Sequence, residues 1–162
     1  MKIKLLKKAL SVLCAISISA AGCIGVEAVK TRLDATAEMA EPIDSCNTQL
    51  NFIKSVICDS SIKSHSEKNL ESSSKLKDLI WQIEWTLKPL ENLCVNDVDE
   101  ANSLKNALRR LYEEILTLKN YIDQEETSEE ELIKHIHTVV IKGAAVSFVK
   151  TRILINAAAL SM

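Results

Sequence analysis

The sequence has few of the residues that turns and sheets require: three glycines, two prolines and 4% aromatic residues in a chain of 162. A many-stranded sandwich or barrel needs more turn residues than this, and a collagen or low-complexity array needs far more glycine or proline. What the chain does contain is 47% hydrophobic and 26% charged residues, which is typical of one folded domain. We therefore expect an all-α protein.

The chain also lacks the basic excess of a nucleic-acid-binding protein. Its formal net charge is −2, and residues 1–22 hold four lysines and no acidic residue. Sixteen of the 20 basic residues and all 22 acidic residues therefore follow residue 22, which gives that part of the chain a net charge of −6. A nucleic-acid-binding domain normally has a net positive charge, so no nucleic-acid partner is predicted.

No catalytic or cofactor-binding signature occurs. A nucleophile elbow, a glycine-rich phosphate loop and a paired-carboxylate motif are all missing, so neither enzyme activity nor a cofactor is predicted. His135 and His137 are two residues apart, which places them on nearly opposite sides of a helix, and no further ligand completes a tetrahedral set. The acidic run at 123–131 lacks the spaced ligands and the glycine of an EF-hand. No metal site is predicted.

The N-terminal residues are typical of a bacterial export signal. A segment with four lysines and an apolar stretch at 9–19 precede a small-residue triplet at 20–22, and Cys23 follows directly. This order resembles the lipobox of bacterial lipoproteins, in which the cysteine is acylated, for example with palmitate, and becomes the new N-terminus. We predict a lipoprotein signal peptide at 1–22, lipidation at Cys23, and an exported protein anchored to the outer membrane and displayed on the cell surface.

Two other interpretations of this segment remain open. One is an ordinary signal peptide before a soluble secreted protein. The other is a permanent transmembrane helix, although the apolar run falls short of the roughly 20 residues that a bilayer requires.

After the signal, apolar residues repeat at steps of three and four, which predicts amphipathic helices. The first begins near Val26, and Pro42 predicts a kink or a break at 39–41, with a second piece at 42–58. The serine-rich stretch at 59–74 is predicted to be a loop.

Three further features complete the predicted helices. A helix is expected at 73–95, where Pro89 kinks it or ends it early. The most regular pattern in the chain predicts a helix at 99–123, with Asp97 or Asp99 as its N-cap. Ser128 stands three residues before a glutamate, a capping-box arrangement that predicts the start of a last helix reaching the C-terminus.

These helices predict a single domain at 23–162, an antiparallel four- to five-helix bundle. A long coiled-coil rod is the structural alternative, because the same spacing suits pairing between copies. The apolar segment at 139–162 contains three basic residues, so we expect a buried central helix there, with an amphipathic helix lying on a membrane as the alternative.

An exported chain meets an oxidising environment, which makes the cysteines after the anchor candidates for a disulfide. Cys46 and Cys58 lie too far apart on one helix to pair. A hairpin of the helices at 42–58 and 73–95 would bring Cys46 opposite Cys94, so we predict that bridge and an unpaired Cys58. The alternative is that all three are buried free thiols.

Trp81 and Trp85 are four residues apart and share one helix face. They either flank the core or form a platform for a partner, since tryptophan is enriched in interface hot spots. Basic side chains either are solvated or gather into a patch for an anionic polymer such as a sulfated glycan. The candidate partner-binding residues besides the tryptophans are Lys88, Lys105, Arg109, Arg110, Lys142, Lys150 and Arg152.

Several short stretches carry a resemblance to a known family. They include Thr31-Arg32-Leu33, Pro42-Ile43-Asp44-Ser45, Leu70-Glu71-Ser72-Ser73-Ser74-Lys75 with the helix at 76–83 behind it, and Lys88-Pro89-Leu90-Glu91. In these stretches the chain resembles the decorin-binding surface lipoproteins of Borrelia spirochaetes. The resemblance implies a five-helix bundle on the outer surface. Lysines of that bundle would bind the glycosaminoglycan chains of host proteoglycans. This chain is acidic, lacks a lysine-rich C-terminal tail and has extra cysteines, so no binding lysine is carried over.

Export, the predicted bundle and this resemblance together predict a lipid-anchored, non-enzymatic adhesin. Its expected partner is a host matrix protein, a glycosaminoglycan or a complement regulator. The alternative is a periplasmic or envelope assembly lipoprotein, which would pair through the apolar stripes of the helices at 76–94 and 104–122, with a homo-oligomer as a possible product.

Overall fold

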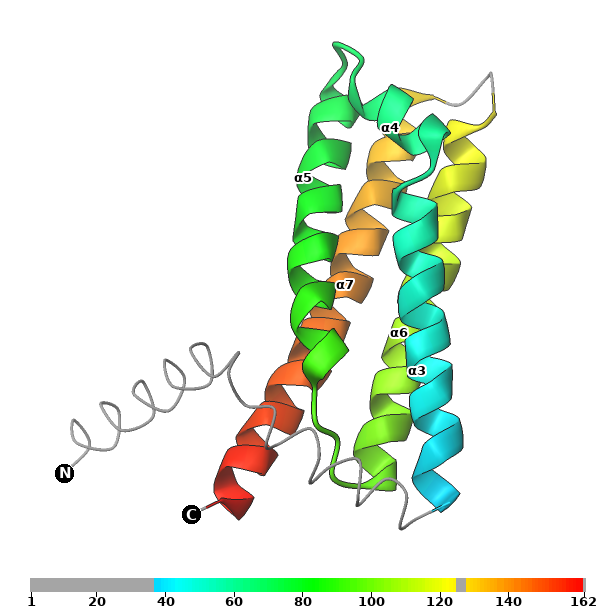
Figure 1. Ribbon diagram of the computed structural model, residues 1–162. Coiled ribbons are helices and arrows are strands. Elements are labelled where there is room, and N and C mark those ends of the chain that lie inside the picture. The colour runs from blue at the N-terminus through cyan, green and yellow to red at the C-terminus, as the bar shows by residue number, and fades with distance from the viewer. Residues whose placement is uncertain (1–36, 125–127, 162) are drawn as a thin grey trace, which may run out of the picture.

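The computed structural model describes residues 37–124 and 128–161, and that part of the chain contains helices and no strands (Figure 1). The predicted all-α fold is confirmed. The signal peptide predicted at 1–22 and the lipidation site Cys23 lie outside the described residues. In chain order the helices are α3 (Ala37–Ile57), α4 (Ser60–Ser66), α5 (Glu71–Leu87), the 3-10 helix η1 (Lys88–Asn92), α6 (Val98–Ile122) and α7 (Glu129–Leu160).

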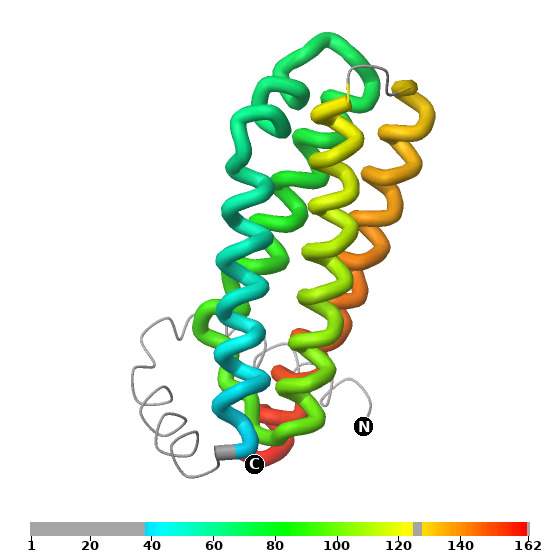
Figure 2. Tube along the Cα trace, turned by 90° about the vertical axis from the view of Figure 1, so that its right-hand side faces the viewer, coloured from blue at the N-terminus to red at the C-terminus, as the bar shows by residue number. Residues whose placement is uncertain are grey.

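The four long helices form a bundle in which consecutive long helices run in opposite directions, as predicted (Figure 1). The closest neighbours, however, are mostly not consecutive in the chain. α3 packs mainly against α6, α6 against α7, and α7 against α5 (Figure 2). α3 therefore lies parallel to α6, and α5 parallel to α7. The segment from η1 to the start of α6 crosses the lower end of the bundle to join two helices that are not close neighbours.

The core contains the apolar stripes that the sequence predicted. The most regular stripe is on α6, where five side chains are at most 3% exposed: Leu104, Leu108, Leu111, Ile115 and Leu118. The stripe of α5 is buried in the same way, with Leu76, Ile83 and Leu87 at most 3% exposed. Both stripes are buried within one chain, so they are not free to pair with another chain as the alternative assumed, and the described residues form a bundle and not the alternative coiled-coil rod.

N-terminal caps fix where α6 and α7 begin. Asp97 is the N-cap of α6, and its carboxylate accepts a hydrogen bond of 2.7 Å from the Glu100 N–H. Ser128 caps α7 by accepting a hydrogen bond of 3.2 Å from the Glu131 N–H. Each side chain satisfies a backbone donor that has no partner inside its own helix. The predicted starts of both helices are therefore confirmed.

Pro42 does not break the first helix, so of the predicted kink or break at 39–41 the break is wrong. α3 is assigned as one helix from Ala37 to Ile57, and Pro42 lies inside it. The proline stands in the second turn of the described helix, so it removes a backbone bond only near one end. Pro89 was predicted either to kink its helix or to end it early, and the second is confirmed. α5 ends at Leu87, and Pro89 lies in the tighter η1.

The serine-rich segment is more ordered than the predicted loop at 59–74. It forms α4, whose N-cap Asp59 accepts hydrogen bonds from the backbone and the hydroxyl of Ser61 at 2.9 and 2.6 Å. α5 then begins at Glu71, and the Ser73 hydroxyl donates to the His65 carbonyl at 2.8 Å. The serine hydroxyls bond to nearby backbone and side-chain oxygens within α4 and between α4 and α5, which is why a serine-rich composition did not produce a loop here.

Candidate functional site

α7 has two apolar faces, one on the core and one on the outside. Leu132, Ile136, Val139, Val146 and Ile153 are buried against the bundle. On the opposite side, three large apolar side chains recur every seventh residue and are mostly exposed: Ile141 (66%), Phe148 (70%) and Ile155 (62%). We call these three residues the outer ridge of α7.

The outer ridge contradicts the prediction of a buried central helix. α7 contacts α6 on one side and α5 on the other, so it is a peripheral helix with one free face. Apolar residues cover two faces of α7, and only one of these faces packs against the core. Among the described helices, none combines the length and apolar character that a bilayer crossing requires.

A groove of about 500 Å³ runs between α6 and α7 beside the outer ridge. α6 forms one wall, and α7 forms the other with two members of the ridge. The residues that line this α6–α7 groove are Ser103, Asn106, Ala107, Arg110, Ile141, Lys142, Ala145, Phe148, Val149 and Arg152.

The α6–α7 groove is cationic. Arg110, Lys142 and Arg152 line it, and its lining contains no acidic residue. Within the described residues, none of these three cations takes part in an ion pair. In addition, residues 132–162 contain no aspartate or glutamate at all. The groove therefore combines apolar contact surface with positive charge that no neighbouring carboxylate neutralises, and it attracts anionic groups.

The structure separates the other predicted basic residues from the groove. The Lys105 ammonium pairs with the Glu41 carboxylate at 2.7 Å, and Arg109 lies 3.8 Å from the Glu113 carboxylate. Lys150 is partly buried, and desolvation lowers its pKa. Together with Lys88, which begins η1, these residues do not line the groove. The structure thus gathers three of the seven predicted basic candidates, Arg110, Lys142 and Arg152.

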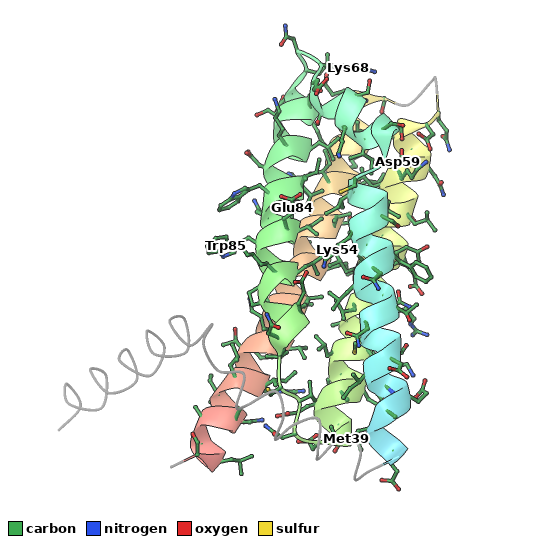
Figure 3. All side chains as sticks on the ribbon, viewed as in Figure 1. Met39, Lys54, Asp59, Lys68, Glu84 and Trp85 are labelled. Carbon is green, nitrogen blue, oxygen red and sulfur yellow. The ribbon has the colours of Figure 1, made fainter. Side chains whose placement is uncertain are left out.

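The two tryptophans are exposed, so the prediction that they flank the core is wrong. The Trp81 and Trp85 rings stack with centroids 5.8 Å apart, and the side chains are 63% and 67% exposed. Figure 3 shows Trp85 projecting away from the bundle. They line a second hollow of about 190 Å³ between α5 and α7, whose α7 wall includes the small residues Gly143, Ala144 and Ser147. The tryptophans are therefore available to a partner that also contacts α7.

The predicted bridge between Cys46 and Cys94 is absent, and Cys46, Cys58 and Cys94 are all free. The Cys46 thiol is buried and lies 3.7 Å from the Ala101 carbonyl oxygen at the start of α6. The physical reason is the packing of α3 mainly on α6, whereas the prediction assumed a tight hairpin of α3 with α5. The alternative of three buried thiols fails too, since Cys58 is exposed and Cys94 is half-buried.

We predict that the three thiols differ sharply in reactivity. Burial raises the pKa of Cys46 to about 11, and the thiolate is the reactive form, so this thiol should resist alkylation until the protein unfolds. Exposed Cys58 should react with iodoacetamide first. Mass spectrometry of peptides from the native protein, with and without denaturant, measures the order. Rapid labelling of Cys46 in the native state, or a Cys46–Cys94 disulfide peptide, would contradict this prediction.

The α6–α7 groove offers apolar contact surface and positive charge. Its lining has no histidine, cysteine, aspartate or glutamate, the groups that most often transfer protons or coordinate metals. Within the described residues, no three histidine, cysteine, aspartate or glutamate side chains gather into a metal site. The His135 ring instead contacts the Tyr121 ring, with centroids 3.9 Å apart. No protein-family model, curated protein or solved structure matches the chain.

Proposed function

We propose that this chain is an exported, lipid-anchored surface protein that binds a host macromolecule through the α6–α7 groove and the outer ridge of α7. The observation that supports this proposal best is the combination of three unpaired cations with exposed Ile141 and Phe148 in one groove. Large apolar side chains in contact with water are unfavourable unless a partner covers them. The class of partner is a matrix protein, a glycosaminoglycan or a complement regulator, and no catalysis is proposed.

Two features of the sequence support the location. The order of lysines, apolar residues and small residues before Cys23 resembles a lipoprotein signal, and acyl chains hold a protein firmly at a membrane. The stretches that resemble decorin-binding surface lipoproteins point to the outer surface and to a helical adhesin. We therefore propose display on the bacterial cell surface.

An envelope assembly lipoprotein is the second candidate. The stripes that we first assigned to pairing lie in the core, so assembly would have to use the outer ridge of α7. The seven-residue spacing of Ile141, Phe148 and Ile155 favours this candidate, because it is the repeat with which helices pair. The two candidates share the binding surface and differ in the partner and in which side of the membrane the protein occupies.

The location is tested by treating intact cells of the source organism with protease and partitioning the protein into detergent, beside its Cys23→Ala variant. We expect rapid loss of detergent-phase protein from intact cells. Protection from protease would favour the envelope candidate, and unchanged partitioning of Cys23→Ala would rule out the lipid anchor.

Binding is tested with Phe148→Glu. We expect this variant to lose at least about tenfold in affinity for an immobilised host partner, because an anchor side chain at an interface is worth about 2 kcal/mol or more. Its thermal unfolding should not change, since Phe148 is 70% exposed. Surface plasmon resonance with matrix proteins, sulfated glycosaminoglycans and complement regulators provides the measurement.

Phe52→Glu is the matched control. It makes the same substitution at the other phenylalanine, which is 46% exposed on α3 and contacts Tyr112 across the bundle surface. Binding should survive in this variant. If Phe52→Glu weakened binding as much as Phe148→Glu, the partner would not be bound through the α6–α7 groove.

A further inference from the structure

We infer that the segment of the partner that occupies the α6–α7 groove is an acidic amphipathic α-helix. This inference rests on the proposed function, because it specifies what the proposed binding surface recognises. It is carried by three properties of the groove: its shape, the spacing of its apolar side chains, and the sign of its charge.

The shape of the site suits a convex, elongated partner. The groove lies between two antiparallel helices and is lined along α7 from Ile141 to Arg152. These eleven steps of helix span about 16 Å, which corresponds to three turns of a partner helix. A helix laid along such a groove inserts apolar side chains into it, as in other helix-in-groove complexes. A flat bilayer surface would cover the ridge and leave the groove unfilled.

The spacing of the apolar side chains suits a helical partner in particular. Ile141, Phe148 and Ile155 follow one another at seven-residue intervals, about 10 Å apart along the axis of α7. A second helix presents its own apolar side chains with the same repeat, so contacts stay in register along the groove at Ile141 and Phe148 and beyond it at Ile155. A sulfated glycan has charge but no apolar stripe, and it would leave the outer ridge in water.

The charge defines which amphipathic helix fits. Arg110 from α6 and Lys142 and Arg152 from α7 line the groove together with apolar side chains, and no acidic residue balances them there. Carboxylates flanking the apolar stripe of a partner helix would meet these cations, whereas lysines would be repelled. A second copy of the chain would bring the same three cations to the contact, so like charges disfavour self-association through this surface.

The inference is tested with two synthetic helical peptides, each about three heptads long, with identical leucines at their a and d positions. One peptide has glutamate at the flanking e and g positions, and the other has lysine. Each peptide is labelled with fluorescein, and fluorescence anisotropy gives its Kd for the purified protein. We expect the acidic peptide to bind at least about tenfold more tightly than the basic one, because three favourable charge contacts replace three repulsive ones.

A charge-reversal variant connects that preference to the groove. Arg110→Glu, Lys142→Glu and Arg152→Glu in one protein should reverse the preference, so that the basic peptide binds more tightly. The matched control reverses three exposed lysines outside the groove, Lys63→Glu, Lys68→Glu and Lys77→Glu, and alters the net charge equally. This control should keep the preference for the acidic peptide, and thermal unfolding confirms that both variants fold.

The first two outcomes below would overturn the inference alone, and the last would overturn the proposed function with it. Equal affinity for the two peptides, or the same preference in the charge-reversal variant and its control, would show that the groove does not select an acidic helix. Failure of both peptides, together with loss of host-partner binding in Phe148→Glu, would mean that the surface binds a partner of another shape. Vesicles of phosphatidylcholine and phosphatidylglycerol that bind where the peptides do not, or a dimer in sedimentation that Phe148→Glu dissociates, would identify a bilayer or a second copy as the occupant.

Discussion

Replacing Leu111 by lysine is expected to unfold the bundle. Leu111 has no exposed surface and lies midway along the buried stripe of α6. A lysine there would place an unpaired ammonium in an apolar core, at a cost of several kcal/mol, which is comparable to the entire stability of a small domain, about 5 to 15 kcal/mol. Leu111→Ala, which leaves a cavity but no charge, should cost about 2 to 5 kcal/mol. Circular dichroism during urea denaturation measures both effects.

Leu116→Lys is the control on the same helix. Leu116 is 37% exposed, so a lysine at this position can extend its ammonium into water, and the free energy of unfolding should change by less than about 1 kcal/mol. A Leu111→Lys protein that stayed helical and only dissociated from an oligomer would contradict the structure. That result would restore the interpretation of this stripe as a surface between copies.

Replacing Glu100 by alanine should loosen the lower end of the bundle. Glu100 is only 4% exposed, and its carboxylate oxygens accept hydrogen bonds from the Asn156 amide at 2.8 Å and from the Asn96 N–H at 3.4 Å. The first bond joins the start of α6 to the last turns of α7, and the second ties the Asn96 N–H, just before the N-cap Asp97, to the first turn of α6. Losing both should cost about 2 to 3 kcal/mol, because a hydrogen bond to a charged group contributes about 1.5 to 3 kcal/mol and the bond to the Asn96 N–H, at 3.4 Å, is long and adds little.

Hydrogen exchange locates this effect. In Glu100→Ala, amides in the last two turns of α7 should exchange faster, while amides in the middle of α6 keep their protection. Asn156→Ala removes only one of the two bonds and should cause a smaller loss of stability. Uniform acceleration along the whole chain would show instead that Glu100 supports the bundle globally.

The sequence predicted the elements whose apolar side chains all face one core. α6 is the clearest example, because its steps of three and four matched the buried stripe. Both ends of α6 fell within a residue of the predicted 99–123, and its start is fixed by the N-cap Asp97. Ser128 determined the start of α7 for the same reason. Caps and periodicity are local properties, so a single sequence contains them.

The errors concern properties that depend on the rest of the fold. A periodic stripe shows that a helix face is buried but not what buries it, so the hairpin of α3 and α5, and with it the Cys46–Cys94 bridge, was predicted from chain order. The outer ridge was missed because α7 is apolar on both sides. Two signals were present in the sequence: the seven-residue spacing of Ile141, Phe148 and Ile155, and the lack of acidic residues in 132–162.

The packing of the bundle also bears on the order in which it folds. α6 and α7 are consecutive and antiparallel, and only a short connection separates them, so their contact closes a small loop. α3 reaches its partner α6 only after the chain has passed through α4, α5 and η1, which makes that contact slower to form. We expect the α6–α7 hairpin to form early and α3 to dock late. The α6–α7 groove belongs entirely to that hairpin, so it can take shape while the rest of the bundle is still assembling.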